Sequence, residues 1–366
     1  MLRSSPLQLA VDRAASDFRR GVPVILFSEE SAILACAAET ADDDAIETLS
    51  DASGTTPLLA LTGVRARALK IGPTGHDTVL IPMTPWLDIT AVRDLPDATH
   101  DLERPLRGPF DREKRPPNPA ESAAVALAKL ARLLPAALLA HLPDAGTALA
   151  EEHGLLRLPA RAVQEFEVTA AEHLKQIGGA NVPLADVGMT RLVPFRPDDG
   201  GIEHLAIVVG DIATDWPVLV RLHSECFTGD LIGSLKCDCG EQLRGALKQI
   251  ADEGAGILLY LAQEGRGIGL INKLRAYRLQ EDGFDTVDSN LKLGFDADER
   301  IFQPAAEMLR RLGVRQVRLM TNNPDKIAGL EACGITVSER VEHSFPANAH
   351  NEFYLTTKRL RSGHLF

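Results

Sequence analysis

The chain of 366 residues carries 39 Lys and Arg against 51 Asp and Glu, a formal net charge of −12. This acidic excess argues against a nucleic-acid partner. No run approaches the ~18 apolar residues of a membrane span, and the N-terminus lacks the apolar core and cleavage site of a secretory signal. The five cysteines are not spaced as disulfide pairs of a small domain, which favours the reducing cytoplasm. The length suggests about two domains.

The sequence of the first half predicts strands that alternate with helices. Its opening segment has the 3.6-residue apolar spacing of an amphipathic helix. Val22–Phe27 and Pro57–Thr62 are short apolar runs that suit buried strands. Residues 121–142 are rich in Ala and Leu, and Pro135 is expected to end a helix there before a further strand. The charged, Pro-rich segment Arg104–Pro119 is expected to be a loop.

A polar helix and then Gly178, Gly179 and Pro183 place a domain boundary in the region 165–190. The expected domains are residues 1–177 and 178–366. In the second domain, strands are expected at Val218–Leu222, Gly256–Tyr260 and Gln316–Thr321, and helices at Gly240–Glu253, Leu270–Gln280 and from Asp325 onward. These patterns predict an α/β fold with two domains.

Three of the five cysteines lie within fourteen residues: Cys226, Cys237 and Cys239. Thiolates are ligands that tetrahedral Zn²⁺ favours, and three protein ligands leave one position open for water, as in catalytic zinc sites. The alternative is a set of buried free cysteines that act as small apolar residues. The polar turn formed by Asp238 and Gly240 around the Cys-x-Cys pair favours the metal site.

Further clusters are expected on loops that follow strands, where α/β folds place their sites. Glu264–Gly269 is a glycine-rich turn whose N–H groups can approach phosphate, with Arg266 as an anion donor, although such turns are often only turns. Asp298–Arg300 pairs a carboxylate with a guanidinium, which is also typical of a solvated surface pair. Thr321–Lys326 suits a phosphate contact by its lysine. Tyr277 lies in a helix, where a tyrosine more often belongs to a core.

In chain order these stretches read RLHSEC, TGD, CDCGEQL, QEGRGIG, NKLRAY, LGFDADER and TNNPDK. This order resembles GTP cyclohydrolase II, the first committed enzyme of riboflavin synthesis, over about residues 178–366, including Asn351–Leu365 near the C-terminus. The resemblance implies GTP as substrate, one Zn²⁺ per chain, Mg²⁺ with the triphosphate, a homodimer and a cytoplasmic location.

The resemblance also assigns roles to single positions. It matches the zinc ligands with Cys226, Cys237 and Cys239. It matches the GTP contacts with Arg221, Leu222, His223, Ser224, Glu225, Gln242, Glu264, Gly265, Arg266, Thr286, Thr321 and Lys326. Asp298 matches the proton acceptor, Arg300 the proposed nucleophile toward the α-phosphorus, and Tyr277 a tyrosine at the purine-ring chemistry.

These roles have a chemical rationale. Hydroxide generated at zinc would attack C8 of guanine and release that carbon as formate. Glu225 and Gln242 carry the donor and acceptor atoms that can read a guanine edge. A guanidinium is protonated at neutral pH, so stabilisation of charge at the α-phosphorus is an alternative role for Arg300. The sequence leaves both roles open.

The first half resembles 3,4-dihydroxy-2-butanone 4-phosphate synthase, which is often fused in front of GTP cyclohydrolase II. The stretches that carry this resemblance are FRRGVPVIL, LALT and SAAVALAKL. The acidic metal-binding loop of that family is shortened here to Ser28–Ser31. The catalytic cysteine falls at Leu58, the metal-binding histidine near Ala120 and the late glutamate near His141. We therefore expect residues 1–177 to be a degenerate domain with a structural or dimer-forming role.

The sequence leaves three alternative functions open. Some homologues of GTP cyclohydrolase II act in uracil catabolism, but these would be expected to differ at the purine or triphosphate contacts. The protein could also be bifunctional, with an active N-terminal synthase. A zinc-stabilised binding module without activity would normally close its site with a fourth ligand, for which His223 is the nearby candidate.

Overall fold

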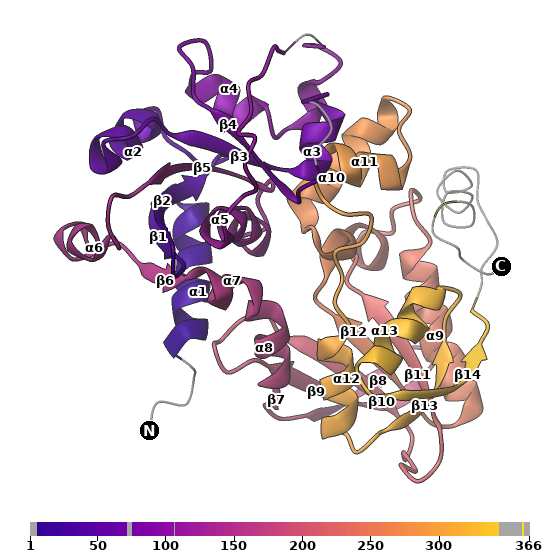
Figure 1. Cartoon of the computed structure of the whole chain (residues 1–366). Coiled ribbons are helices and arrows are strands. Elements are labelled where there is room, and N and C mark those ends of the chain that lie inside the picture. Colours follow the sequence, from indigo (N-terminus) through magenta and orange to yellow (C-terminus); the bar gives the residue numbers. More distant parts are fainter. Residues whose placement is uncertain (1–5, 72–74, 106, 344–360, 362–366) are drawn as a thin grey trace. The chain divides into compact units, whose positions relative to one another are not determined.

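The computed structural model describes residues 6–71, 75–105, 107–343 and 361. The chain forms two compact units, and neither is continuous in sequence (Figure 1). Unit 1 contains the chain up to Phe166 together with Ile271–Glu299. Unit 2 contains Glu167–Leu270 together with the chain from Arg300. The chain thus crosses from one unit to the other between Phe166 and Glu167, and again at either end of the segment Ile271–Glu299.

Unit 1 is built on a six-stranded mixed sheet in the order β4-β3-β5-β2-β1-β6. Its strands are β1 (Val24–Phe27), β2 (Ala32–Ala37), β3 (Leu58–Thr62), β4 (Thr78–Pro82), β5 (Ala136–His141) and β6 (Arg157–Pro159). The strands β1 and β6 are parallel, and the other neighbours are antiparallel. In the β1–β2 hairpin Phe27 pairs with Ala32, so residues 28–31 form the whole connection.

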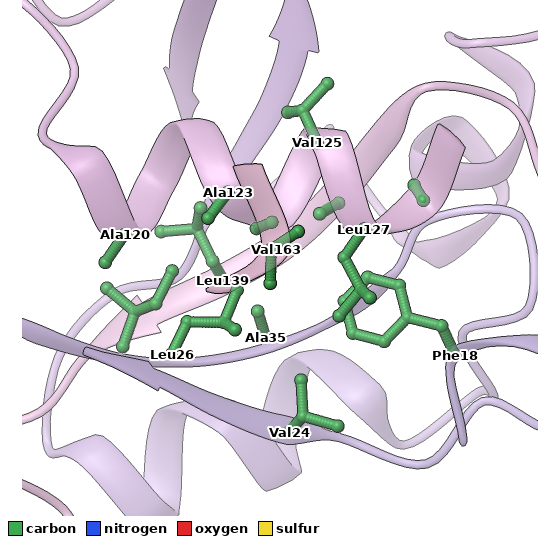
Figure 2. Packing of buried hydrophobic residues seen from close by; sticks show 14 of the residues in the cluster. Phe18, Val24, Leu26, Ala35, Ala120, Ala123, Val125, Leu127, Leu139 and Val163 are labelled. Carbon is green, nitrogen blue, oxygen red and sulfur yellow. The ribbon is translucent and has the colours of Figure 1, made fainter. Parts of the chain in front are cut away.

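Helices cover both faces of this sheet. They are α1 (Pro6–Arg19), α2 (Ala45–Ser53), α3 (Gly63–Ala68), α4 (Ile89–Asp94), α5 (Pro119–Leu130), α6 (Thr147–His153) and α7 (Ala160–Gln164), with the 3₁₀ turn η1 (Ala98–His100). The helices α1, α5 and α7 bury residues such as Phe18 against Leu26 and Leu139 of the sheet (Figure 2). Because strand residues alternate between faces, Ile25 and Leu138 pack on the opposite side with α2 and α4.

Helix α5 begins where the sequence provides a complete N-terminal cap. The Asn118 side chain accepts the Glu121 N–H at 2.9 Å, the Glu121 carboxylate accepts the Asn118 N–H at 2.6 Å, and Pro119 occupies the first turn. This reciprocal pattern satisfies N–H groups that a helix start otherwise leaves without partners. The helix ends at Leu130, before Pro135.

Two helices from the second half of the sequence belong to unit 1: α10 (Leu270–Glu281) and α11 (Thr286–Lys292). Helix α11 contacts α3, and the two lie side by side in Figure 1. The Asp285 side chain caps α11 by accepting the Asp288 N–H at 2.7 Å. The segment Ile271–Glu299 of unit 1 therefore consists of most of α10, all of α11 and the loop that follows α11.

Unit 2 contains a mixed sheet in the order β14-β13-β11-β12-β10-β9-β7, and β8 pairs with β9. Its strands are β7 (Lys175–Gln176), β8 (Ala180–Leu184), β9 (Gly188–Arg196), β10 (His204–Val209), β11 (Val218–Ser224), β12 (Gly256–Leu261), β13 (Gln316–Met320) and β14 (Thr336–Val341). The pairs β12–β11, β11–β13 and β13–β14 are parallel, whereas β10 is antiparallel to both of its neighbours.

Three helices of unit 2 pack on the two faces of this sheet: α9 (Cys239–Glu253), α12 (Gln303–Arg311) and α13 (Pro324–Ala332). The chain also forms α8 (Phe166–Glu172), which begins at the last residue of the first segment of unit 1, and the short turns η2 (Phe227–Leu231) and η3 (Glu264–Gly267). Leu309 of α12 and Leu330 of α13 share a core with Val220 of β11. Leu247 of α9 packs on the other face with Leu258 of β12.

The predicted α/β fold is confirmed, and the strands and helices named from the sequence are present, most of them within one or two residues of their expected bounds, although α5 ends at Leu130, earlier than the expected end at Pro135. One local expectation is wrong. Asp298–Arg300 does not follow a strand, because it lies between α11 and α12. Lys326 lies in the first turn of α13, the helix expected from Asp325 onward, and Asn323 caps that helix by accepting the Asp325 N–H. The expected match at Asn351–Leu365 lies outside the described residues, apart from Arg361.

Candidate functional site

The carboxyl ends of three parallel strands of unit 2 carry most of the predicted site residues. The loop after β11 contains Glu225 and Cys226, the turn after β12 begins at Glu264, and the turn after β13 begins at Thr321. Parallel strands bring their carboxyl ends to one edge of a sheet, where α/β proteins usually bind ligands. The fold therefore gathers motifs that are about 40 to 100 residues apart in the sequence.

The three cysteines form one cluster at this edge. Their sulfur atoms all lie within 4.8 Å of one another, and the Sγ atoms of Cys226 and Cys237 are 3.7 Å apart. Ligands 2.3 Å from a tetrahedral zinc ion would be about 3.8 Å apart, so this separation fits a shared metal ion. Gly229 leaves room for the cluster, because an added Cβ would lie 2.8 Å from Cys237 Sγ and 2.9 Å from Cys239 Cβ.

The raised pKa values of the cysteine thiols are also consistent with a cation bound by the cluster. The neighbouring Cys226 thiol and burial raise the pKa of Cys237, and they raise the pKa of Cys239 well above its usual value. Three adjacent thiolates repel one another in a buried site, so a positive ion is needed to hold all three in the ligand form. Among the described residues, no other group of His, Cys, Asp or Glu side chains has such a spacing.

A buried carboxylate fixes the loop that carries Cys226. Asp230 Oδ2 accepts the Cys226 N–H at 3.0 Å and the Tyr260 hydroxyl at 3.0 Å. His223 Nε2 lies 3.1 Å from both Asp230 oxygens, and the imidazole stacks on the Tyr260 ring at 5.6 Å. An ionised Asp230 can only accept hydrogen bonds, so Nε2 of His223 carries the proton. His223 Nε2 is thereby engaged, and His223 is not among the side chains whose ligand atoms lie within 4.8 Å of one another in the cysteine cluster.

Burial decides the charge states around this carboxylate. Burial lowers the pKa of His223, and the hydrogen bond to Asp230 opposes that change only in part. Burial and the nearby Asp230 raise the pKa of Tyr260 above its usual range. At neutral pH the structure therefore holds a neutral imidazole and a neutral phenol that both donate to Asp230.

The side chains of Arg221 and Gln242 contact each other. Arg221 Nη2 donates to Gln242 Oε1 at 2.6 Å, and Nη1 donates to the Met320 carbonyl at 2.9 Å. The Gln242 amide donates in turn to Asp238. Burial lowers the pKa of Arg221 to about 10, which still leaves it charged at neutral pH. Arg221 Nε is buried without a hydrogen-bond partner, so this cation is only partly satisfied by protein groups.

Lys326 and Thr321 are also engaged with the protein. Lys326 is only 8% exposed, and its Nζ donates to the Leu222 carbonyl at 2.7 Å. The Thr321 hydroxyl accepts the Asn323 N–H at 3.0 Å, which stabilises the turn before α13. The predicted contact of these side chains with a ligand therefore requires that they exchange or share partners.

The glycine-rich turn after β12 is tied to the cysteine loop by Glu264. The Glu264 carboxylate is buried, and it accepts the Phe227 N–H at 2.6 Å and the Gly265 N–H at 2.9 Å. Gly265 and Arg266 both have φ near +64° in this turn. That conformation is costly for a side chain larger than glycine, so the turn holds Arg266 in an uncommon backbone geometry.

The remaining predicted residues do not all lie in one unit. Tyr277 is half-buried on α10, Thr286 is the first residue of α11, and Asp298 is half-buried on the loop after α11, all in unit 1. Arg300, Ser224 and the other GTP-contact positions belong to unit 2. The chain passes from one unit to the other between Glu299 and Arg300.

The sequence reasoning assigned no role to Asp230, Tyr260 and His343. Asp230 stood in the TGD motif, but its partners come from β11 and β12 and cannot be read from local spacing. His343 is buried, and its Nε2 lies 3.0 Å from the Gln242 carbonyl. Burial and the nearby Arg221 lower the pKa of His343 to about 4.

The N-terminal positions compared with the synthase family differ in exposure: Leu58 and Ala120 are buried, His141 is partly exposed, and the loop 28–31 lies at the surface. Glu121 is fully buried, and its carboxylate contacts Arg115 and accepts the Asn118 N–H. His141 Nε2 lies 2.8 Å from Glu121 Oε1. Ala120 is part of the hydrophobic core. The hairpin loop is held by a hydrogen bond from Ser28 N–H to the Ser31 carbonyl at 2.8 Å.

Comparisons with known proteins agree with the geometry of unit 2. A sequence model of the family described as GTP cyclohydrolase II matches residues 175–342. A protein of Azospirillum brasilense named GTP cyclohydrolase-2 is 50% identical over 361 residues, which cover 98% of this chain and 94% of that protein. Riboflavin biosynthesis protein RibBA of Chlorobium phaeovibrioides is 47% identical over 253 residues, which cover 66% of this chain and 61% of that protein.

Among solved structures, RibBX, a two-domain 3,4-dihydroxy-2-butanone 4-phosphate synthase from A. baumannii, matches 92% of this chain and 99% of its own, at 17% identity and a TM-score of 0.36. At that TM-score the likeness supports no conclusion. In the part of the chain that the structure describes, no helix combines the length and the apolar character needed to cross a membrane. The near-full-length match to the Azospirillum protein places this chain in the GTP cyclohydrolase II family of enzymes.

Proposed function

We propose that the protein hydrolyses GTP to 2,5-diamino-6-(5-phosphoribosylamino)pyrimidin-4(3H)-one, formate and diphosphate, the first committed step of riboflavin biosynthesis. The observation that carries this proposal is the cysteine cluster at the carboxyl edge of β11 and β12, beside the buried cations Arg221 and Lys326. A ligand cluster for a Lewis acid and positive charge for a polyphosphate are the two features that this reaction needs.

Cys226, Cys237 and Cys239 would hold one zinc ion, since their spacing fits tetrahedral coordination. When bound, zinc lowers the pKa of a water molecule toward ~7 and so supplies a nucleophile for C8 of guanine. Asp230 keeps the Cys226 backbone in place through its hydrogen bond. With His223 engaged by Asp230, the described residues offer three ligands, which is the count of an open catalytic site rather than a closed structural one.

The other predicted residues would bind and orient the substrate. Arg266 and Lys326 would neutralise the triphosphate, and a Mg²⁺ ion would supply further positive charge to it. Glu225 and Gln242 would read the guanine edge, although Gln242 must first exchange its contact with Arg221 or Asp238. Asp298 would accept a proton.

Tyr277 would act at the purine ring, and Arg300 would stabilise charge at the α-phosphorus. Arg221, Leu222, His223, Ser224, Glu264, Gly265, Thr286 and Thr321 complete the proposed set. Arg221 and His223 are buried and engaged with protein groups, so they would act by supporting the residues around them.

The proposal is tested by formate release from GTP with purified protein, before and after treatment with a chelator and after zinc is restored. Loss and recovery of formate release are expected. The Cys237→Ser variant should lose most of its zinc by elemental analysis, and full zinc retention would move the ligand set elsewhere. A homologue of uracil catabolism would release no formate from GTP, so the same assay separates the two readings.

We also propose that the N-terminal half has no synthase activity. Its acidic loop is reduced to residues 28–31, and the buried Glu121 is already engaged by Arg115, His141 and the Asn118 N–H. Leu58 stands where the thiol is expected. Incubation of the full chain with ribulose 5-phosphate and Mg²⁺ should therefore yield no formate. Turnover that disappears when Glu29 and Glu30 are changed to Gln would instead make the protein bifunctional.

The proposed assembly is a homodimer in the cytoplasm, where GTP is available, with residues 1–177 and 178–366 as its two sequence domains. Light scattering coupled to size-exclusion chromatography gives the oligomeric state directly. A monomer at micromolar concentration would contradict this part of the proposal.

A further inference from the structure

One ion pair connects the N-terminal half to the loop that carries Asp298. Lys129, in the last turn of α5, places its Nζ 2.7 Å from Glu299 Oε1 and 3.8 Å from Asp296 Oδ2. The same Glu299 oxygen accepts the Asp296 N–H at 2.7 Å. Lys129 therefore contacts both ends of the turn 296–299, and Asp298 is one of the residues of that turn.

A second set of contacts fixes the start of this loop. Arg65 of α3 is 1% exposed, donates to the Lys292 carbonyl at 3.0 Å, and is itself held by a two-pronged contact with Asp101. The Thr62 hydroxyl donates to the Gly294 carbonyl at 2.8 Å. Gly294 has φ +86° and packs so closely that an added Cβ would lie 2.9 Å from Thr62 Oγ1.

Helix α10, which carries Tyr277, is held by the same half of the sequence. Arg275 donates to Glu39 at 2.8 Å and lies 3.2 Å from Asp97. The Asn272 amide donates to the Arg132 carbonyl at 3.2 Å. The segment 271–299 is thus held by contacts at three places: at α10, at the start of the loop after α11 and at the end of that loop.

We infer that the N-terminal half positions the segment 271–299 for the cyclohydrolase reaction, and that Lys129 is a positioning residue for Asp298. The inference rests on the proposed function, because it takes Asp298 as the proton acceptor. It gives a half without synthase chemistry a role in the reaction of the other half. Lys129 is assigned no contact with a reacting group and acts through Glu299 and Asp296.

The expected effect is on turnover more than on stability. Lys129 and Glu299 are partly exposed, with 28% and 19% of their side chains accessible. Exposed and partly exposed ion pairs contribute little to global stability. A catalytic group displaced by about 1 Å can nevertheless lose ~100-fold in rate, so a loosened turn would lower kcat while the fold remains.

The test compares Lys129→Ala, Lys129→Glu and Lys129→Arg in the full chain, with Lys248→Ala as the matched control. Lys248 is exposed on α9 and pairs with Asp252 at 3.3 Å, away from the segment 271–299 in sequence. For each variant, kcat and KM for formate release from GTP, zinc content and melting temperature are measured. Hydrogen exchange of peptides covering residues 292–299 reports on the turn directly.

We expect Lys129→Ala to lower kcat about tenfold or more, with a smaller change in KM and unchanged zinc content. Lys129→Glu should be worse, because it repels Glu299 and Asp296, and Lys129→Arg should recover most of the rate. Amide exchange at 292–299 should accelerate in the Ala and Glu variants but not in Lys248→Ala.

Normal kcat and unchanged exchange in Lys129→Ala would overturn the inference, as would a rate loss that follows zinc loss or melting temperature alone. A wild-type protein that releases no formate from GTP would instead refute the proposed function, and the positioning role would fall with it.

Discussion

Glu121 provides a direct test of the closed network in unit 1. Its carboxylate is fully buried at the start of α5. Burial alone would raise the pKa of Glu121. The hydrogen bonds from Arg115, His141 and the Asn118 N–H outweigh burial and lower this pKa from 4.5 to about 2. We predict that Glu121→Gln destabilises unit 1 and removes part of its sensitivity to acid.

The magnitude follows from the pKa of Glu121. A difference of about 2.5 pH units between the unfolded and folded states corresponds to about 3 kcal/mol of stability. Because the folded-state pKa is the lower one, this contribution is fully present above pH ~4.5 and is lost as the pH falls toward 2. Glu121→Gln should therefore cost about 3 kcal/mol at pH 7 and much less at pH 3.

The two tryptophans allow the units to be followed separately. Trp86 belongs to unit 1 and Trp216 to unit 2. In a Trp216→Phe background, fluorescence during urea unfolding reports on unit 1, and the shift in midpoint gives the change in stability. The matched control is Glu113→Gln, because Glu113 is 37% exposed and lies 3.9 Å from the same Arg115. It should cost less than ~1 kcal/mol.

A cost for Glu121→Gln that is equal at pH 3 and pH 7 would refute this reasoning, since the effect would then come from packing rather than charge. A cost at pH 7 no greater than that of the Glu113 control would refute it as well.

Three further predictions concern the site and the loop after α11. Gly229→Ala should sharply lower zinc content without unfolding the chain, because its Cβ would lie 2.8 Å from Cys237 Sγ; normal zinc by elemental analysis would contradict the assigned cluster. Lys326→Ala and Arg266→Ala should each weaken GTP binding by ~1.5–3 kcal/mol in titration calorimetry while zinc stays bound; unchanged affinity in both would place the triphosphate elsewhere. Gly294→Ala should destabilise unit 1 by ~1–3 kcal/mol in the Trp86 urea assay, since its φ is +86° and Arg65 Cβ lies 3.1 Å from the new atom; a neutral effect would mean that the loop can shift.

The cysteine cluster could be predicted because its signal is local. Cys226, Cys237 and Cys239 lie within fourteen residues, and strand β11 delivers them to the sheet edge that α/β folds use. The strands and α5 were also predicted from local apolar and Ala/Leu-rich patterns, although the Asn118 cap that starts α5 was not recognised and the helix ends at Leu130, before Pro135. Local periodicity and turn chemistry determine these features.

The grouping of residues 271–299 with the N-terminal half could not be predicted in the same way. Arg65 and Lys292 are 227 residues apart, and neither belongs to a motif that indicates the other. A buried arginine finds backbone carbonyls wherever packing places them, so composition gives no signal. Asp298 lies on a loop as expected, but that loop follows helix α11, which the Asp285 cap starts, and does not follow a strand.

Two of the buried carboxylates among the described residues, Glu121 and Asp230, show how a supporting network differs from a site. Glu121 and Asp230 are each engaged by several donors, one of them a histidine. The partners of Glu121 hold only the start of α5. One partner of Asp230 is the backbone of Cys226, whose sulfur belongs to a cluster that fits a metal ion. A carboxylate with all its acceptor sites engaged thus informs about function only through the groups that its partners hold in place, and by that criterion the cysteine loop is the candidate site.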